Sequence, residues 1–334
     1  MKKTILAVAM TAAMASGSVF AAEIYSSDAG AVVLGGHLRT QLQKVGDSDV
    51  KLNAGSSRVS IGATYGLTDS IDALGYVEFG LSGNGGELEN RLHYTGVVGD
   101  FGSLTFGRQW TVADDFGSAD VSYFYGGGAN TSTSFTSGRH DSLIKYSHTI
   151  GSVSFAVGYG LGANAEDNDQ QEIAEANINA VFGPFTIGGS FGTAEDLNLI
   201  KGKKVEADYG TAVATYTIDA LTLLAGASAQ TVSVDGQDLD STGYQATATY
   251  SWSEKATAYA GYEAIEYKAA GLKEDGSFFY VGTDYRFNSF ARIYVEVARV
   301  DGSAINISND SANNVTAKRL DDETAFGAGF RVYW

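Results

Sequence analysis

Hydrophobic and polar residues alternate with a period of two along most of this chain. The C-terminal segment shows the pattern clearly: Phe326, Ala328, Phe330, Val332 and Trp334 are apolar, whereas the residues between them are glycine, arginine or tyrosine. Successive side chains of a strand point to opposite faces, so this segment is predicted to be a strand with one apolar face. Such a strand suits a wall between lipid and water.

The same alternation recurs often enough to predict about sixteen strands, an even number as antiparallel closure of a bacterial barrel requires. The predicted strands cover residues 32–42, 57–65, 72–81, 88–98, 103–109, 139–149, 152–161, 172–182, 185–195, 203–217, 220–231, 242–252, 255–267, 277–287, 290–300 and 323–334. We therefore expect an all-β fold, a transmembrane antiparallel β-barrel. A soluble β-sandwich would need shorter strands and an apolar interior.

The connections between these strands alternate in length. Short turns are predicted at residues 67–70, 99–102, 150–151, 183–184, 218–219, 253–254 and 288–289. Longer polar loops are predicted at residues 45–54, 162–171, 196–202, 233–241, 271–276 and 301–322. Short periplasmic turns and long external loops are typical of outer-membrane barrels. Residues 110–138 form the longest stretch without a strand pattern, and their aromatic content indicates that they pack inside the barrel.

The N-terminus has the pattern of a secretory signal peptide. Lys2 and Lys3 precede an apolar stretch at residues 5–15, and small residues surround a cleavage position after Ala21. This pattern predicts a signal peptide at residues 1–21 and a single barrel domain at residues 22–334. Removal of the signal leaves 20 basic against 39 acidic residues, a net charge of −19. A chain this acidic is not expected to bind nucleic acid.

Composition excludes several kinds of chemistry. The chain has no cysteine, so disulfides, thiolate metal sites and cysteine nucleophiles are absent. It has 42 glycines but one proline, which fits long hydrogen-bonded strands. His140, Asp141 and Ser142 are consecutive, so a strand would point Asp141 away from the other two, a poor arrangement for a catalytic triad. No catalytic site, metal site or cofactor is predicted.

Several short segments together resemble the general porins of Gram-negative outer membranes. They are Ala22-Glu23-Ile24-Tyr25, the strand end Thr105-Phe106-Gly107-Arg108, the pair Gly126-Gly127 and the C-terminal aromatic residue. The resemblance spans the chain after residue 21. It implies a homotrimeric, water-filled channel in the outer membrane, narrowed by a third loop that folds inward. It also implies contact with outer-membrane lipid and lipopolysaccharide, and an assembly signal at Phe330 and Trp334 that the barrel-assembly machinery reads.

The resemblance further implies a constriction between a basic wall and acids on the inward loop. The basic positions are His37, Arg39, Arg58, Arg91, Arg108 and Arg139, and the acids are Asp114, Asp115 and Asp120. Alternation supports inward positions for His37, Arg39, Arg58, Arg91 and Arg139, with Leu38, Val59, Leu92 and Ile144 on the opposite faces and His93 inward like Arg91. Arg108 lies at the mouth of the long connection 110–138. The family often carries Pro-Glu-Phe-Gly-Gly at the loop tip, where this chain has Tyr123-Phe124-Tyr125-Gly126-Gly127.

The function predicted from these features is passive diffusion of ions and small hydrophilic solutes, with weak cation selectivity because the chain is acidic. An alternative is a channel that prefers oligosaccharides, as chitoporins do. Its sugars would stack on loop aromatics, namely Trp110, Phe116, Tyr123, Phe124 and Tyr125. A more distant alternative is an outer-membrane barrel that acts as an enzyme or an adhesin.

Overall fold

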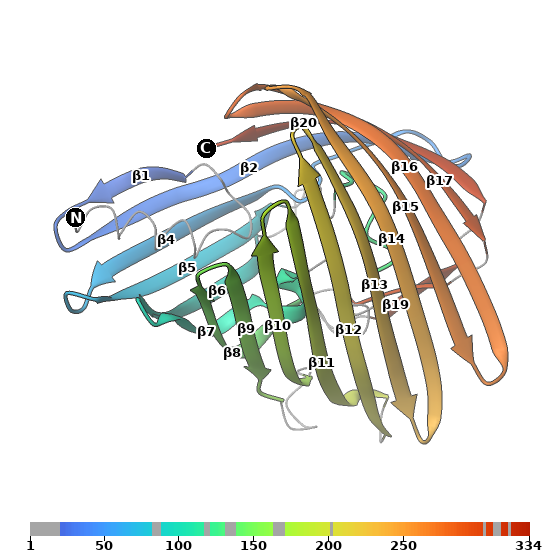
Figure 1. Cartoon of the computed structure of the whole chain (residues 1–334), viewed down its shortest axis with the longest axis horizontal. Coiled ribbons are helices and arrows are strands. Elements are labelled where there is room, and N and C mark those ends of the chain that lie inside the picture. Colours follow the sequence, from blue (N-terminus) through green and yellow to red (C-terminus); the bar gives the residue numbers. More distant parts are fainter. Residues whose placement is uncertain are drawn as a thin grey trace.

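The described part of the computed structural model is one β-barrel (Figure 1). It comprises residues 21–81, 88–116, 121–130, 138–162, 171–200, 203–302, 305–309, 315–319 and 322–334. The predicted signal peptide lies outside these residues except for Ala21, and it stays a prediction. No helix in the described ranges is long and apolar enough to cross a membrane.

Sixteen antiparallel strands close the barrel, as the sequence predicted. Their bounds are β2 (Gly30–Val45), β4 (Arg58–Gly66), β5 (Ile71–Leu81), β6 (Leu88–Gly99), β7 (Gly102–Trp110), β8 (Arg139–Ile150), β9 (Val153–Gly160), β10 (Glu172–Phe182), β11 (Phe185–Ile200), β12 (Lys203–Ile218), β13 (Leu221–Val234), β14 (Gln237–Ser253), β15 (Ala256–Ala269), β16 (Leu272–Asn288), β17 (Ala291–Gly302) and β20 (Glu323–Tyr333). Each strand pairs with the next, and β20 pairs with β2 to complete the ring.

The described residues also form four short strands, of which β1 and β3 add to the wall. β1 (Ala21–Ser26) pairs with the first half of β2, whose second half pairs with β20, so β1 and β20 share one edge of β2. β3 (Lys51–Asn53) pairs with the second half of β2 on its other edge. β18 (Ile305–Asn309) and β19 (Val315–Arg319) form a separate hairpin within the segment predicted as the loop 301–322.

Three predicted external loops are wrong, because most of residues 196–202, 233–241 and 271–276 belong to strands. β13 and β14 meet at a two-residue turn of Asp235 and Gly236, with φ of 52° and 75°. β15 and β16 meet at Ala270 and Gly271, with φ of 51° and 81°. Positive φ at both central residues matches the right-handed twist of a hairpin. The polar residues of these segments looked like loops in the sequence, although they belong to strands that continue past the apolar band of the wall.

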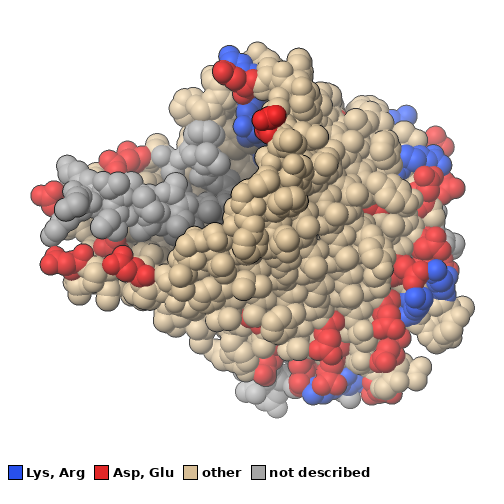
Figure 2. Space-filling view, viewed as in Figure 1, with Lys and Arg blue, Asp and Glu red and all other residues tan. Residues whose placement is uncertain are grey.

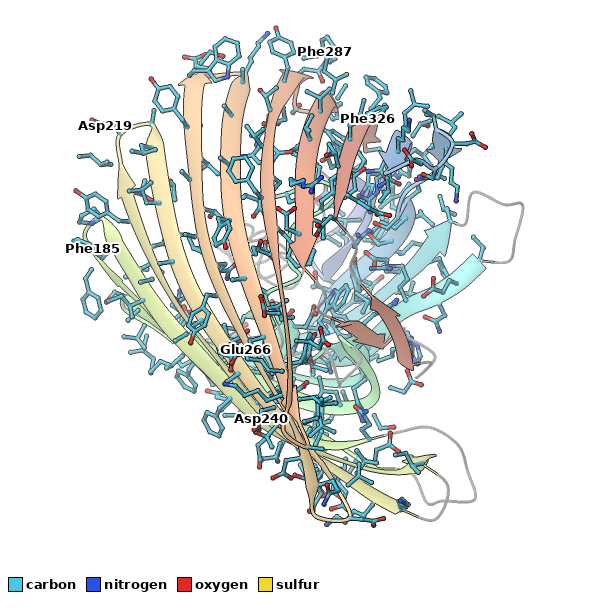
Figure 3. All side chains as sticks on the ribbon, turned by 90° about the vertical axis from the view of Figure 1, so that its right-hand side faces the viewer. Phe185, Asp219, Asp240, Glu266, Phe287 and Phe326 are labelled. Atoms are coloured by element: carbon cyan, nitrogen blue, oxygen red, sulfur yellow. The ribbon has the colours of Figure 1, made fainter. Side chains whose placement is uncertain are left out.

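The outer wall carries the apolar face of each strand. Ile178, Phe191, Val281 and Val297 are among the large apolar side chains exposed there. The middle of the wall in Figure 2 is nearly free of charged residues, which gather at its margins. Phe185, Asp219 and Phe287 lie at the end where β10 turns into β11 and β12 into β13, and Asp240 and Glu266 lie toward the opposite end (Figure 3). This distribution fits a wall in contact with lipid.

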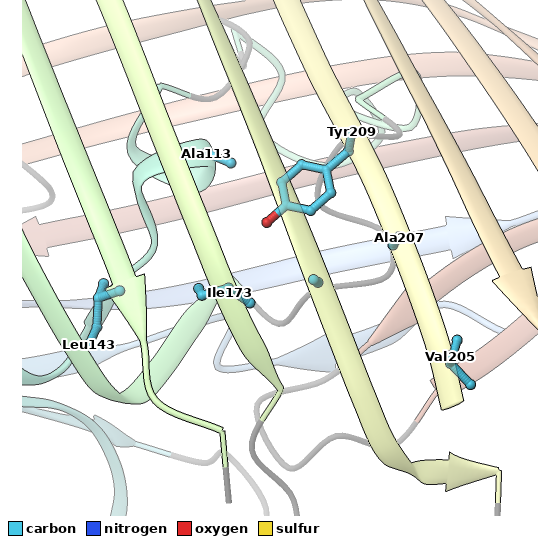
Figure 4. Close-up of a cluster of buried hydrophobic side chains, with 7 residues drawn as sticks. Ala113, Leu143, Ile173, Val205, Ala207 and Tyr209 are labelled. Atoms are coloured by element: carbon cyan, nitrogen blue, oxygen red, sulfur yellow. The ribbon is translucent and has the colours of Figure 1, made fainter. Parts of the chain in front are cut away.

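The barrel interior is partly filled by apolar side chains. One cluster, drawn in Figure 4, joins β8 and β10–β12 to a short helix between β7 and β8, and it consists of Ala113, Leu143, Ile173, Ala194, Val205, Ala207 and Tyr209. A second cluster joins β15–β17 to the same connection, with Tyr259, Tyr280 and Ala298 as its buried members. These clusters hold the connection against the inner wall.

Candidate functional site

The connection between β7 and β8 folds into the barrel, as the sequence predicted. It begins with α2 (Val112–Asp115), whose first backbone amides are capped by the hydroxyl of Thr111, 3.3 Å from the amide of Asp114. Val112 and Ala113 are fully buried against the apolar cluster of β8 and β10–β12. We call the described parts of this connection, residues 111–116, 121–130 and 138, the inward loop.

Three buried glutamates of the wall hold the inward loop by its backbone. Glu175 on β10 accepts a hydrogen bond of 3.0 Å from the amide of Ala113 and one of 2.7 Å from the hydroxyl of Tyr209. Glu263 on β15 accepts hydrogen bonds of 2.7 and 2.9 Å from the amides of Gly127 and Ala129. Backbone amides thereby compensate carboxylates that are 4% and 1% exposed.

Glu296 on β17 makes the densest set of contacts with the loop. Its carboxylate accepts hydrogen bonds from the amides of Tyr123 and Tyr125 at 2.8 and 3.0 Å. It also accepts from the hydroxyl groups of Ser122 and Tyr259, each at 2.7 Å. None of these three glutamates was predicted from the sequence. The signal that could have found them is their position, because each lies on the inward face of its strand, where alternation alone would have placed it.

The basic wall is broader than the sequence predicted. Arg286, Arg292, Arg331 and Arg39 lie directly opposite one another on β16, β17, β20 and β2. On the other side of β2, Arg58 lies opposite His37. The structure therefore places the predicted residues His37, Arg39 and Arg58 on the interior beside three arginines that were not predicted. We call the four arginines in register the arginine row.

Carboxylates compensate this wall unevenly. The carboxylate oxygen Oδ2 of Asp284 lies 3.4 Å from Nε of Arg286 and 3.7 Å from a terminal guanidinium nitrogen of Arg292. Glu78, which is 2% exposed, lies 3.5 Å from Arg58 and 2.8 Å from Arg91. Within the described ranges, Arg39 and Arg331 have no ion pair.

Tyrosine rings take the place of acids at this wall. Tyr123 of the inward loop stacks on Tyr294 with ring centroids 4.2 Å apart, and its hydroxyl accepts a hydrogen bond of 2.7 Å from Arg292. The guanidinium of Arg331 lies 5.5 to 5.8 Å from the ring centroids of Tyr294, Tyr123 and Tyr333. Cation–π contact therefore supplies part of the compensation that a carboxylate would give.

A cavity of about 550 Å³ lies between the inward loop and the basic wall. Its lining consists of Arg39, Ser56, Arg58, Val121, Ser122, Tyr123, Thr249, Thr257, Tyr259, Asp284, Arg286 and Arg331. Most of these side chains carry a charge or a hydroxyl group, so the cavity is suited to water and polar solutes. We call it the constriction cavity.

The other predicted basic residues form a second group where the loop leaves the wall. Arg91 and Arg139 each lie 5.5 Å from the ring centroid of Trp110. Arg139 pairs with Glu89 at 3.2 Å, and Arg108 pairs with Asp141. The predicted ladder is therefore divided in two, and Glu78 links its halves by contacting both Arg58 and Arg91.

The predicted loop acids do not form the second wall of the constriction cavity. Asp115 pairs with Lys145 at 2.5 Å, and Asp120 lies outside the described residues. Asp114 is half-buried, and its partial burial raises its pKa to about 7, with Asp115 and Glu175 adding to the shift and Arg139 and Lys145 opposing it. Among the described residues of the loop, Tyr123, which occupies the place of the loop-tip proline, contacts Arg292 and Arg331 of the arginine row.

The predicted solute-contact aromatics mostly contact protein. Trp110 lies against two arginines, as described above. Phe124 lies 5.4 Å from Tyr294 and against Gly327, and the hydroxyl of Tyr125 donates a hydrogen bond of 2.7 Å to the carbonyl of Phe326. Tyr123 alone among the described predicted aromatics lines the constriction cavity.

A β-bulge corrects the predicted alternation on β6. Glu78 pairs with Leu92 while Phe79 pairs with Asn90, so Arg91 is an extra residue between them. Leu92 consequently turns inward with Arg91 and is 1% exposed, although it was predicted on the opposite face. His93, predicted inward, is exposed and hydrogen-bonded to Asn90.

The C-terminal aromatic residues and His140 contact neighbouring strands and backbone. Trp334 packs on the backbone at Gly36, and Phe330 is 44% exposed on the outer wall, 6.4 Å from Phe287. Their role as an assembly signal stays a prediction. The ring of His140 is buried and contacts the carbonyl of Gln171 at 2.6 Å. The described ranges hold no group of three or more metal-ligating side chains.

Comparison with known proteins adds the family context. A family model described as Gram-negative porin matches residues 7–305. Porin-like protein H of Photobacterium profundum is 27% identical over 325 residues, which cover 90% of this chain and 95% of that protein.

Solved structures give the same picture. OmpT, an outer membrane protein of Vibrio cholerae folded in vitro, is 33% identical and superposes with a TM-score of 0.84, covering 94% of this chain and all of that one. Its trimer form gives a TM-score of 0.83 at 33% identity and covers 92% of this chain and all of that one.

Proposed function

Because the chain belongs to the Gram-negative porin family, we propose that its barrel is an outer-membrane channel for passive diffusion of ions and small hydrophilic solutes. The family assignment indicates a channel and not an enzyme. The observation that carries the proposal is the constriction cavity, a polar space between the inward loop and the basic wall. Solutes in such a space keep their hydration or exchange it for side-chain contacts.

Passage through the channel depends on the charged and polar side chains that surround the water in the constriction cavity. The three wall glutamates fix the inward loop, so the width of the passage is set by a segment with little freedom to move away. The arginines line the side of the passage away from the loop, and Ser122 and Tyr123 line the loop side. Polar solutes find hydrogen-bonding groups on both sides, whereas long apolar molecules must displace water without replacing its contacts.

We propose weak cation selectivity for small salts. The exposed acids Asp47, Asp235, Asp238, Asp275 and Asp301 lie in or next to external connections, where they raise the local concentration of cations. The arginine row opposes this effect inside the channel, so the preference is expected to be weak.

A sugar track on the loop aromatics is a second proposal, and Tyr123 is the observation in its favour because its ring lines the constriction cavity. The wall contacts of Trp110, Phe124 and Tyr125 favour an anchoring role for those rings. Current block by malto- or chito-oligosaccharides that is lost in Tyr123→Leu would support the track. Unblocked current at millimolar sugar would exclude it.

We further propose a homotrimer in contact with lipid and lipopolysaccharide, assembled by the barrel-assembly machinery. The trimer form of the Vibrio cholerae protein supports the stoichiometry, and the apolar outer wall supports the lipid contact. Electrophoresis of unheated protein should show a band that converts to monomer on heating. A purified, folded barrel that remains monomeric at every detergent concentration would contradict the trimer.

Liposome swelling tests passive diffusion directly. Vesicles that contain the folded protein should swell in isotonic arabinose or glucose, and more slowly in stachyose, because larger sugars fit the constriction less well. Vesicles without protein are the control. Absence of swelling in every sugar would contradict an open channel.

A further inference from the structure

Arg39 and Arg331 stand apart from the other arginines of the constriction. They lie directly opposite one another on β2 and β20, and Arg331 also lies opposite Arg292 on β17. Like charges in directly opposed positions destabilise a sheet. Arg58, Arg286 and Arg292 each have a carboxylate partner within 4 Å, whereas Arg39 and Arg331 have no ion pair among the described residues. The barrel therefore concentrates positive charge here, and Asp284, which lines the same cavity, forms ion pairs only with Arg286 and Arg292 at the other end of the row.

Hydrogen bonding is also incomplete at four arginines of the basic wall. The Nε atoms of Arg39, Arg58, Arg292 and Arg331 are buried and have no acceptor within the described ranges. A buried donor without an acceptor costs stability. Buried hydrogen-bond donors without acceptors are rare in folded proteins because they lower stability. A cluster of them beside one cavity is expected where function, and not stability, determines the residues.

The constriction cavity gives these guanidinium groups access to solutes. Arg39, Arg58 and Arg331 all line it, and its volume of about 550 Å³ accommodates a small organic molecule. Hydroxyl groups of Ser56, Thr249 and Thr257 line the same space. Guanidinium groups bind carboxylate and phosphate oxygens in pairs, and hydroxyl groups bind sugar hydroxyls.

From this arrangement we propose that the constriction cavity is a binding site for small organic oxyanions, with sugar phosphates and sugar acids as the solute class. The anionic group binds between Arg39 and Arg331 with Arg58 beside it, and the hydroxylated body contacts Ser56, Thr249 and Thr257. The proposal rests on the channel function and adds a solute preference to it. Binding must be weak, because a solute that passes through a channel has to leave its site quickly.

The test is current block in planar bilayers. Glucose 6-phosphate in the millimolar range should reduce the open-channel current in a concentration-dependent way, and glucose at the same concentration should not. Inorganic phosphate should block at a higher concentration than glucose 6-phosphate, because it lacks the hydroxylated body. All solutions are matched in ionic strength with potassium chloride, since salt screens charge.

Variants assign the block to the arginines. Arg331→Gln and Arg39→Gln should each raise the half-blocking concentration of glucose 6-phosphate about tenfold or more, because each removes a charged hydrogen-bond donor. Arg331→Lys keeps the charge without the paired donors and should give an intermediate value. Arg299→Gln is the matched control, because Arg299 pairs with Asp301 beyond the constriction cavity.

The outcomes separate this proposal from the channel function. Conducting channels that glucose 6-phosphate and phosphate do not block more than glucose would overturn the oxyanion site and leave the channel intact. Block that is unchanged in both glutamine variants would also overturn it. Absence of conductance in the unmodified protein would instead contradict the channel itself, and the oxyanion site with it.

Discussion

At the scale of single residues, the unusual feature is a set of buried carboxylates compensated by backbone amides and hydroxyls. Glu175, Glu263 and Glu296 point into the barrel and hold the inward loop through hydrogen bonds to its main chain. Main-chain contacts do not depend on the identity of the loop side chains. The loop tip can therefore carry Tyr123, Phe124 and Tyr125 and still keep its position.

Substitution of Glu296 tests this role. In Glu296→Gln the new amide group brings donors toward the amides of Tyr123 and Tyr125, so at least one buried donor loses its acceptor, at a cost of about 1–3 kcal/mol. We expect a looser loop, seen as larger fluctuations of the open-channel current in bilayer recordings. Glu254→Gln, in the exposed turn after β14, is the control and should behave like the unmodified protein. Unaltered current noise in Glu296→Gln would contradict the tethering role.

Asp114 gives the inward loop a pH-dependent stability. Its pKa is raised to about 7 from an ordinary value of 3.8, chiefly by burial. Between these values the folded protein keeps a proton that the unfolded chain loses, so stability falls as the pH rises through this range. Asp114→Asn removes the titrating group and should stabilise the protein more at about pH 8 than at about pH 5.

Thermal unfolding of the folded barrel, followed by electrophoresis at both pH values, measures this difference. Asp100→Asn is the control, because Asp100 is exposed in the turn before β7. An equal gain from Asp114→Asn at both pH values would contradict the account of Asp114.

At the scale of elements, alternation predicted the strands well and failed where local geometry interrupts it. The faces of β2, β4 and β20 follow from the period of two, so His37, Arg39 and Arg58 were predicted correctly to lie inside. The bulge at Arg91 shifts the pattern of β6 by one residue, and nothing in the residue types there announces it. The arginine row was also missed, because it depends on the register between four strands, one of which is distant in sequence from the other three.

The hairpin of β15 and β16 offers a test at this scale. Ala270 has a φ of 51°, which costs an L-residue roughly 1 kcal/mol and costs glycine almost nothing. Ala270→Gly should therefore strengthen the hairpin and slow hydrogen exchange of the neighbouring strand amides. Ala269→Gly, in the last position of β15, is the control and should speed exchange. Faster exchange in Ala270→Gly would show that the turn is not strained at Ala270.

At the scale of the whole molecule, the channel has acidic outer connections and a basic constriction. The fold, the closure and the inward loop were predictable from the sequence. The contents of the constriction were not, because they depend on how the inward loop lies in the lumen. Tyr123 contacts Arg292 through its hydroxyl, while Glu296 holds its backbone amide.

This charge distribution determines the ion selectivity of the channel. We expect the reversal potential in a potassium chloride gradient to show a weak preference for cations. Arg331→Gln removes one positive charge from the constriction and should strengthen that preference. Arg299→Gln, beyond the constriction cavity, should change it less. A clear anion preference in the unmodified protein would show that the arginine row outweighs the acidic connections.

The most direct test of the central claim, an open channel narrowed by a tethered loop, is planar-bilayer recording with purified, unheated protein in concentrated salt. We expect a large, long-lived conductance that closes in three equal steps, one for each barrel of a trimer. A folded barrel that inserts without conductance would mean that the inward loop blocks the lumen completely, and it would contradict the account.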